Sequence, residues 1–240
     1  VSDLIAAGIV PAAVEMMDRL CLVAVEQWLQ AGLPTHAAAA LLIECVGPPG
    51  QVAAEVARIR ELADERNVAG VRIAADDAER DVLWKGRKSA FGAVAQVKPN
   101  YYLHDTVVPR AKLAEVIEKV YEITNRHEID VINVFHAGDG NLHPLLVYDA
   151  REEGISERVH AAGREIVAFS VAVGGVLSGE HGIGLEKRDL MPLMFSEIDL
   201  AAQEALRTAF DPQLIANPNK VLPNPATCGD LHAVPEGAWI

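Results

Sequence analysis

The chain of 240 residues has few cysteines, a deficit of basic residues and no long hydrophobic run. Its three cysteines, Cys21, Cys45 and Cys228, lack the CxxC spacing of metal sites, so we expect free thiols in a reducing cytoplasm. Lysine and arginine number 21 against 34 acidic residues. The resulting net charge of −13 argues against nucleic acid or an anionic membrane as the main partner. The apolar stretches are shorter than the ~20 residues that a membrane-spanning helix needs.

The amino-terminal end shows no targeting signal, because Asp3 interrupts the first apolar stretch. The chain begins at Val1 instead of methionine, so we expect it to be part of a longer protein. Half of the residues are hydrophobic, which suffices for a buried core and argues against disorder. The length predicts one large domain or two small ones.

The hydrophobic pattern predicts an α+β fold of ferredoxin-like type, an antiparallel sheet covered by helices with a helical C-terminal portion. The expected extended segments are 37–45, 71–74, 101–109, 130–136 and 141–148. The expected helices are 12–30, 51–67, 76–97, 112–126 and 152–173, followed by a largely helical region to about residue 210.

The most informative segment is Phe135–His143, in which Asp139-Gly140 separates two apolar runs. An Asp-Gly pair in that setting predicts a two-residue type I′ turn. This register would pair His136 directly with His143 on one face of a hairpin, with Cβ atoms about 5 Å apart. Two imidazoles at that spacing could share one metal ion. The alternative is a hairpin whose two histidines face water.

A second segment, SGEHGIG at 178–184, places Glu180 beside His181 among glycines that let the backbone approach a ligand closely. Glu180 is the expected third ligand after the two histidines, and three protein ligands leave a position open for substrate. His181 could then act as a base, because an ordinary histidine has a pKa near 6.5. The alternative is a surface turn with an ion pair.

Two further segments are less specific. In WKGRK at 84–88, Arg87 could bind a carboxylate through two parallel hydrogen bonds, whereas Lys85 and Lys88 indicate a solvated helix face. The closing segment NPNKVLP at 217–223 by itself indicates a loop.

Together these motifs carry a family resemblance over about residues 8–223. WKGRKSAF, DTVVPR, HAGDGNLHP, SGEHGIG and NPNKVLP resemble segments of the C-terminal domain of FAD-linked 2-hydroxy acid oxidoreductases. This family belongs to the vanillyl-alcohol oxidase type. Glycolate oxidase flavin subunits are the most similar branch, with D-lactate and D-2-hydroxyglutarate dehydrogenases as relatives.

The resemblance implies that residues 1–240 form the cap or substrate domain, and that an N-terminal FAD-binding domain is absent from this chain. It also implies that His136, His143 and Glu180 hold a divalent metal, usually zinc, and that His181 is the catalytic base. The donor set itself suits iron as well. We expect FAD to be bound mainly by the missing domain, because no GxGxxG loop preceded by a strand is present here.

The resemblance assigns Arg87 to the substrate carboxylate and Asn217 to the surroundings of the isoalloxazine ring. The family's usual NPGK reads NPNK here, with Asn219 in place of glycine. If that position has a positive φ, asparagine is the best substitute for glycine.

The implied reaction oxidises a 2-hydroxy acid such as glycolate or D-lactate to the 2-oxo acid, with hydride transfer to FAD. We expect the chain alone to be inactive and to form oligomers, with partners among the small 2-hydroxy acid, the FAD-binding domain, other oxidase subunits and an electron acceptor. We expect no nucleic acid partner. The expected location is the cytoplasm, or the inner membrane periphery through partner subunits.

Two other functions stay open on the residues alone. A free-standing metal-dependent hydrolase explains the histidines and the glutamate equally well. A non-catalytic domain of a larger complex could keep the fold without the flavin.

Overall fold

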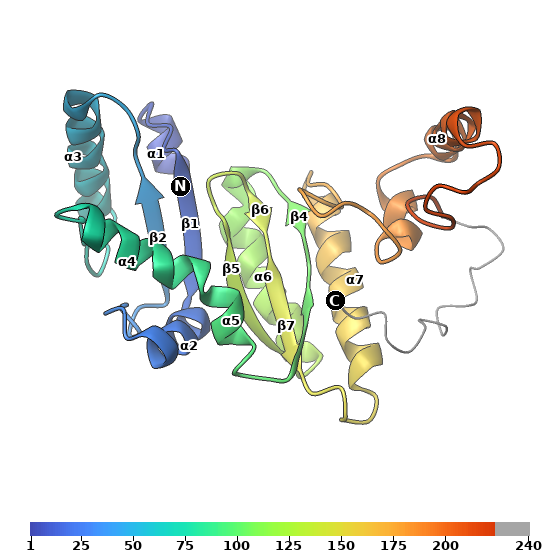
Figure 1. The fold of residues 1–240 in the computed structure, drawn as a ribbon, viewed down its shortest axis with the longest axis horizontal. Coiled ribbons are helices and arrows are strands. Elements are labelled where there is room, and N and C mark those ends of the chain that lie inside the picture. Colours follow the sequence, from blue (N-terminus) through green and yellow to red (C-terminus); the bar gives the residue numbers. More distant parts are fainter. Residues whose placement is uncertain (224–240) are drawn as a thin grey trace. The chain divides into compact units, whose positions relative to one another are not determined.

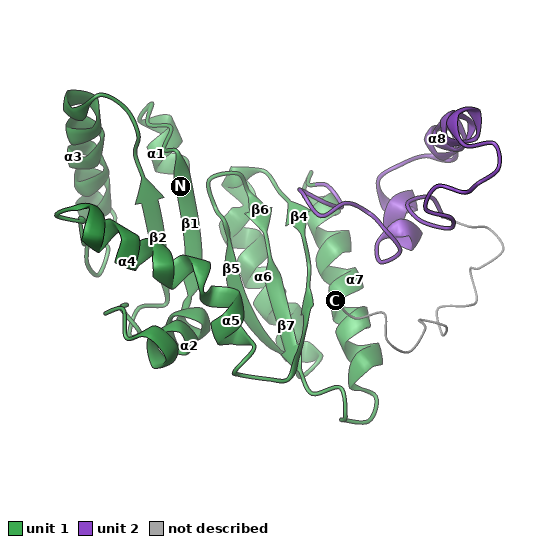
Figure 2. Cartoon of the chain, in the orientation of Figure 1, with its two compact units in different colours: residues 1–175 green, residues 176–240 purple. Residues whose placement is uncertain are grey.

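The computed structural model describes residues 1–223, in two compact units (Figure 2). The first unit is Val1–Gly175, and the second is Val176–Ile240, described as far as residue 223. Cys228 therefore lies outside the described residues.

The first unit is built on one antiparallel sheet. Its strands are β1 (Ala13–Asp18), β2 (Ala39–Glu44), β3 (Asn100–Leu103), β4 (Thr106–Val107), β5 (Asp130–His136), β6 (Asn141–Leu142) and β7 (Pro144–Tyr148). The strand order is β2-β1-β5-β6-β4, and β7 pairs with both β3 and β5. This arrangement confirms the predicted α+β class with an antiparallel sheet, and it makes β5 the central strand (Figure 1).

The helices of the first unit are α1 (Ser2–Ala6), α2 (Arg19–Leu29), α3 (Pro49–Glu65), α4 (Asp77–Lys88), α5 (Ala90–Val94), the 3₁₀ turn η1 (Arg110–Lys112), α6 (Leu113–Arg126) and α7 (Ile155–Ala172). None of the helices within residues 1–223 is both long and apolar enough to cross a membrane.

Two hydrophobic cores lie on opposite faces of the sheet (Figure 1). In one core, α6 and α7 pack on side chains that include Val131 and Phe135. In the other, α2 and α5 pack on Met17, Ile132 and Val134. Because both of its faces are covered, β5 is apolar almost without alternation. Strand geometry sends every second side chain to the same face, so Glu15 and His136 share the face of Met17 and Val134.

The prediction of one helix over 12–30 is wrong for its first part. Residues 13–18 form β1, which lies between β2 and β5, and the helix starts at Arg19. The side chains from Val14 to Met17 are all buried, so the segment has no period of two that would mark it as a strand. Asp18 caps α2 by accepting a 2.9 Å hydrogen bond from the amide of Cys21.

Two other expected elements differ. Residues 71–74 form no strand; Val71 and Ile73 are exposed, so this stretch has no buried face to pair. The expected helix over 76–97 is divided at Ser89 into α4 and α5. The packing of α5 on α2 is close: a Cβ at Gly92 would lie 2.4 Å from the Trp28 ring.

The second unit contains the 3₁₀ helix η2 (Arg188–Leu193) and α8 (Glu197–Phe210). A capping box starts α8: the Ser196 hydroxyl accepts from the amide of Asp199, and the Asp199 carboxylate accepts from the amide of Ser196. Arg207 holds the following loop by donating to the carbonyls of Ala216, Asn217 and Lys220.

Candidate metal and substrate site

The histidine hairpin forms, but in a different register from the one expected. His136 pairs with Asn141, and Asn133 pairs with Pro144, so His143 is level with Val134. Four residues, 137–140, therefore connect the two strands. The prediction that His136 pairs directly with His143 is wrong. The difference is a shift of two residues, and strand side chains repeat with a period of two. Both histidines consequently stay on one face, as diagonal neighbours.

Contacts to other strands explain this longer connection. The Gly138 amide donates to the Val14 carbonyl at 2.9 Å, and the Gly140 carbonyl accepts from the Val108 amide at 2.9 Å. Gly140 has a φ of +73°, and a Cβ there would lie 2.2 Å from the Val108 carbonyl oxygen. The Arg110 guanidinium also donates to the Gly138 carbonyl. The loop is thus held on one side by β1 and on the other by the segment after β4. The local Asp-Gly pattern carries no information about these contacts.

The two imidazoles lie close together at the end of the central strands. Their ring centroids are 5.4 Å apart, with an angle of 84° between the ring planes. His143 is buried at 2% exposure, whereas the His136 side chain is 36% exposed. One ring is therefore fixed by the protein interior and the other faces outward.

His136 is also held from the neighbouring strand by Glu15, its direct partner in the β1–β5 ladder. The Nδ1 atom of His136 lies 2.8 Å from Oε1 of Glu15. The other carboxylate oxygen, Oε2, accepts a hydrogen bond from Nε of Arg87 at 2.9 Å and forms an ion pair with its Nη2 at 2.8 Å. Arg87, the expected substrate ligand, is thereby a buried residue of α4 connected to His136 through one carboxylate.

Sequence reasoning missed Glu15. The pattern around it predicts a helix, and the two partners of Glu15 lie 72 and 121 residues further along the chain. The one available signal was a single carboxylate between apolar neighbours, since a buried acid requires a charged or polar partner.

Farther along β1, Asp18 connects the strand to three other elements. Its Oδ2 accepts from the amide and side chain of Asn133 and from the Tyr121 hydroxyl at 2.8 Å. Burial raises the pKa of Asp18 above its ordinary value despite these hydrogen bonds. Burial also raises the pKa of Cys21 to about 12, with the negative charge of Asp18 as the next cause. These groups fix the strand that presents Glu15.

In the second unit, Glu180 and His181 lie in the expected glycine-rich loop. Both side chains are about half exposed, and Nε2 of His181 lies 3.7 Å from Oε1 of Glu180. The Gly182 amide, at a φ of +84°, donates to the Ser178 hydroxyl at 2.8 Å. The loop therefore folds back on itself, and both side chains stay partly exposed.

The closing segment is attached to the same loop. The Val221 amide donates to the Gly184 carbonyl at 2.7 Å, and Arg188 donates to the Asn219 carbonyl. Asn219 has a φ of +62°, so it meets the condition under which asparagine is the best substitute for glycine. Asn217 also has a positive φ, +46°, and is exposed.

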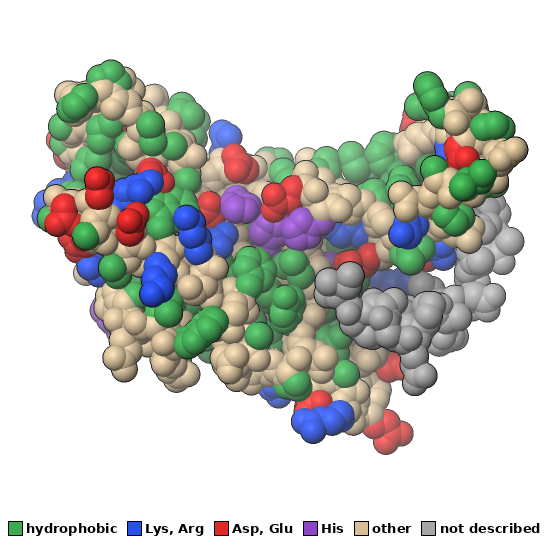
Figure 3. Space-filling view, viewed as in Figure 1, with side chains coloured by type: hydrophobic (Ala, Val, Ile, Leu, Met, Phe, Trp, Pro, Cys, Tyr) green, Lys and Arg blue, Asp and Glu red, His purple; other side chains and the backbone are tan. Residues whose placement is uncertain are grey.

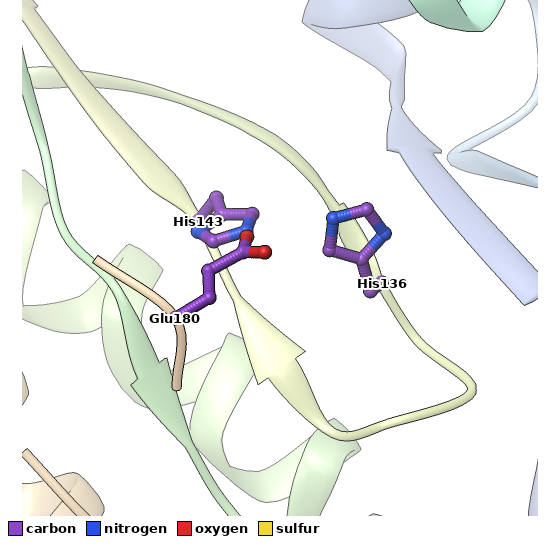
Figure 4. A group of neighbouring side chains, drawn as sticks. All are labelled: His136, His143 and Glu180. Carbon is purple, nitrogen blue, oxygen red and sulfur yellow. The ribbon is translucent and has the colours of Figure 1, made fainter. Parts of the chain in front are cut away.

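Three of the expected residues form a group of possible metal ligands. His136, His143 and Glu180 each offer one ligand atom, and these atoms all lie within 4.8 Å of one another (Figure 4). Histidine and acidic side chains also gather on the face drawn in Figure 3. Neighbouring ligands of a tetrahedral zinc ion stand about 3.4 Å apart.

Comparison with known proteins identifies the family of the chain. Residues 1–221 match the family described as FAD linked oxidases, C-terminal domain. The chain is 41% identical over 234 residues to glycolate oxidase subunit GlcD of Escherichia coli K12, which covers 98% of this chain and 47% of that protein. It is 37% identical over 221 residues to GlcD of Bacillus subtilis, covering 92% and 47%. The mitochondrial D-lactate dehydrogenase [cytochrome] of Kluyveromyces lactis is 29% identical over 235 residues, covering 92% and 39%.

Solved structures share the fold at low sequence identity. p-Cresol methylhydroxylase with substrate bound aligns with a TM-score of 0.62 and 12% identity, over 87% of this chain and 46% of that one. The isoeugenol complex of 4-ethylphenol oxidase from Gulosibacter chungangensis gives 0.59 and 17%, over 88% and 47%. The chain spans about half the length of the relatives it matches, or less. By its match over residues 1–221, the chain belongs to the family of FAD-linked oxidases and corresponds to their C-terminal domain.

Proposed function

We propose that this chain is the substrate domain of a flavin-dependent dehydrogenase that oxidises a 2-hydroxy acid of glycolate or D-lactate type to the 2-oxo acid. The observation that carries the proposal is the group formed by His136, His143 and Glu180, whose ligand atoms lie within 4.8 Å of one another. It occurs in a chain whose relatives are named for glycolate and D-lactate. In this proposal the FAD-binding domain belongs to the rest of a longer protein.

The donor set fits a divalent metal. Two imidazoles and one carboxylate are the protein ligands of many catalytic zinc sites, and they also suit iron. Three protein ligands leave room for a substrate oxygen. A divalent ion held there would lower the pKa of the substrate hydroxyl. We propose zinc, with iron as the alternative.

Residues of this chain would also orient the substrate and accept its proton. Arg87 would orient the substrate carboxylate: Glu15 occupies the Nε side of the guanidinium, and the Nη1 side offers further donors. His181 would accept the hydroxyl proton at a ring nitrogen, a task suited to a histidine at neutral pH. FAD supplies the redox chemistry when bound, by accepting the α-hydrogen with its electron pair. Asn217, on an exposed loop held by Arg207, would lie near the isoalloxazine ring.

The longer protein would act with other oxidase subunits or an electron acceptor. We propose a cytoplasmic oligomer that reaches the inner membrane through such partners.

The test is turnover by the full-length flavoprotein on a panel of D- and L-2-hydroxy acids with an artificial electron acceptor. We expect flavin reduction by glycolate or D-lactate, and loss of turnover when a chelator removes the metal. Absence of flavin reduction by every 2-hydroxy acid would contradict the proposal. Hydrolysis of an ester or amide panel, with no flavin bound, would favour the metal-dependent hydrolase instead.

A further inference from the structure

The geometry points to Glu15 as a positioning residue that fixes the metal ligand His136 and the carboxylate anchor Arg87 in one hydrogen-bonded chain. This inference rests on the proposed function, because it concerns the same site. It adds a residue whose part in that site is to set the ring nitrogen and the orientation that His136 presents.

The contacts of Glu15 divide its two oxygens between two partners. Oε1 lies 2.8 Å from Nδ1 of His136, and Oε2 accepts a hydrogen bond from Nε of Arg87 at 2.9 Å and lies 2.8 Å from its Nη2. The side chains of Glu15 and Arg87 are each 8% exposed. Glu15 is also the direct cross-strand partner of His136, so the backbone ladder itself sets their separation.

The chemistry of this contact determines which nitrogen of His136 can bind a metal. A carboxylate accepts a hydrogen bond, so Nδ1 must carry the proton that it donates to Glu15. In the neutral ring, Nε2 then carries the lone pair that can ligate a metal. Metal-bound histidines in general donate their second N–H to a carboxylate or carbonyl, which fixes the tautomer and increases ligand basicity.

A purely structural ion pair does not explain the arrangement as well. Replacing a buried ion pair by well-packed apolar residues is often neutral or stabilising, so the pair is weak evidence for a role in stability alone. The chain offers a direct comparison in Glu44 of β2, which pairs with Arg80 of the same helix α4. Glu44 has the strand-to-helix ion pair without a histidine, and Glu15 has both.

The experiment compares zinc affinity in the full-length protein with Glu15→Gln and the matched control Glu44→Gln. Affinity is measured by competition with a chromophoric chelator, and the ligand field by the absorption spectrum of the Co²⁺-loaded protein. A glutamine replaces one of the two carboxylate oxygens by an NH₂ donor, which would face either Nδ1 of His136 or the Arg87 guanidinium. We therefore expect E15Q to bind zinc 10–100-fold more weakly and to shift the cobalt bands. We expect E44Q to leave both measurements within about twofold of the wild type.

A second variant is needed because E15Q leaves the Arg87 charge buried without its full carboxylate partner, which could unfold the protein. The double variant Glu15→Leu with Arg87→Met removes both charges and keeps an apolar contact between β1 and α4. We expect the same loss of zinc affinity with a circular dichroism spectrum like that of the wild type. Wild-type affinity and cobalt spectrum in either folded variant would overturn the role of Glu15. A wild-type protein that binds no zinc would instead overturn the metal site of the proposed function, and this role with it.

Discussion

The rings of His136 and His143 lie 5.4 Å apart although the two residues are not paired in the ladder. They are diagonal neighbours on one face, and the connection between their strands is held by β1 and by the segment after β4. The side-chain pair thus depends on contacts distant in the sequence.

Replacement of His136 or His143 by alanine in the full-length protein is expected to abolish stoichiometric zinc binding and to reduce turnover severely. Each variant removes one of three ligands, so neither the hydroxyl acidity nor the substrate orientation is supported. Metal content by mass spectrometry is the measurement. His36→Ala, at an exposed histidine in another part of the first unit, is the control and should keep its metal.

Replacement of His181 by alanine is expected to leave the metal bound and to slow turnover by about 10²–10⁴-fold, the usual effect of losing a general base. A variant that keeps its metal but turns over slowly has lost a base, whereas a variant that loses its metal has lost a ligand. Loss of zinc in H181A, together with retention of zinc in E180Q, would exchange the roles of these two residues.

Replacement of Gly140 by alanine is expected to destabilise the fold by about 3 kcal/mol, from the strain of a positive φ and from overpacking. The new Cβ would lie 2.2 Å from the Val108 carbonyl oxygen, so the hairpin must move. Gly154→Ala separates the two causes, because Gly154 has a φ of +71° and an added Cβ there would meet no atom within 4 Å. We expect about 1 kcal/mol there. Equal losses in thermal unfolding of the two variants would show that the close contact at Gly140 has no effect.

The two cysteines within the described residues should differ in reactivity. Burial raises the pKa of Cys21 to about 12, so its thiolate is scarce at pH 8 and inaccessible in the folded protein. Cys45 is half-buried, and its pKa is raised mainly by partial burial. In a Cys228→Ser background at pH 8, mass spectrometry should find a thiol reagent on Cys45, with Cys21 protected until urea unfolds the chain. Rapid labelling of Cys21 would contradict its burial.

Asp18 should give the free energy of unfolding a pH dependence with a defined sign. Burial raises its folded pKa above the unfolded value of ~3.9, so the folded state holds this proton more tightly. Its contribution to stability is therefore complete below about pH 3.9 and is lost as the pH rises through the raised folded pKa. Asp18→Asn removes this slope in urea unfolding between pH 4 and 7. The substitution also turns a side-chain amide toward the Asn133 amide donor, which we expect to lower the free energy of unfolding by ~1–3 kcal/mol.

Several elements could be predicted because their signals are local. The range 130–136 predicted for β5 is the observed one, and 112–126 differs from α6 by one residue. These segments carry a hydrophobic pattern that matches one secondary structure throughout. The positive φ of Asn219 agrees with the conditional interpretation of that position, at which asparagine replaces the family's glycine.

Other features depend on partners that no local pattern contains. The sequence pattern of β1 predicts a helix because burial on both faces removes the alternation that marks a strand. The expected helix over 12–30 also overlooked Asp18, which is the N-cap of α2 in the structure. The same error concealed Glu15, whose pairing with His136 follows from the order of strands in the sheet. The prediction of the hairpin register was wrong for a related reason. Contacts of Gly138 and Gly140 with other segments outweigh the preference for a two-residue turn.

The most direct test of the central claim is X-ray anomalous scattering at the zinc edge from crystals of the full-length protein, with iron-edge data as its comparison. The account predicts one anomalous peak per chain, about 2.0–2.2 Å from Nε2 of His136, a ring nitrogen of His143 and a carboxylate oxygen of Glu180. A peak at the iron edge alone would change the metal and keep the site. The absence of any peak at these three residues in a protein that oxidises 2-hydroxy acids would contradict the metal site.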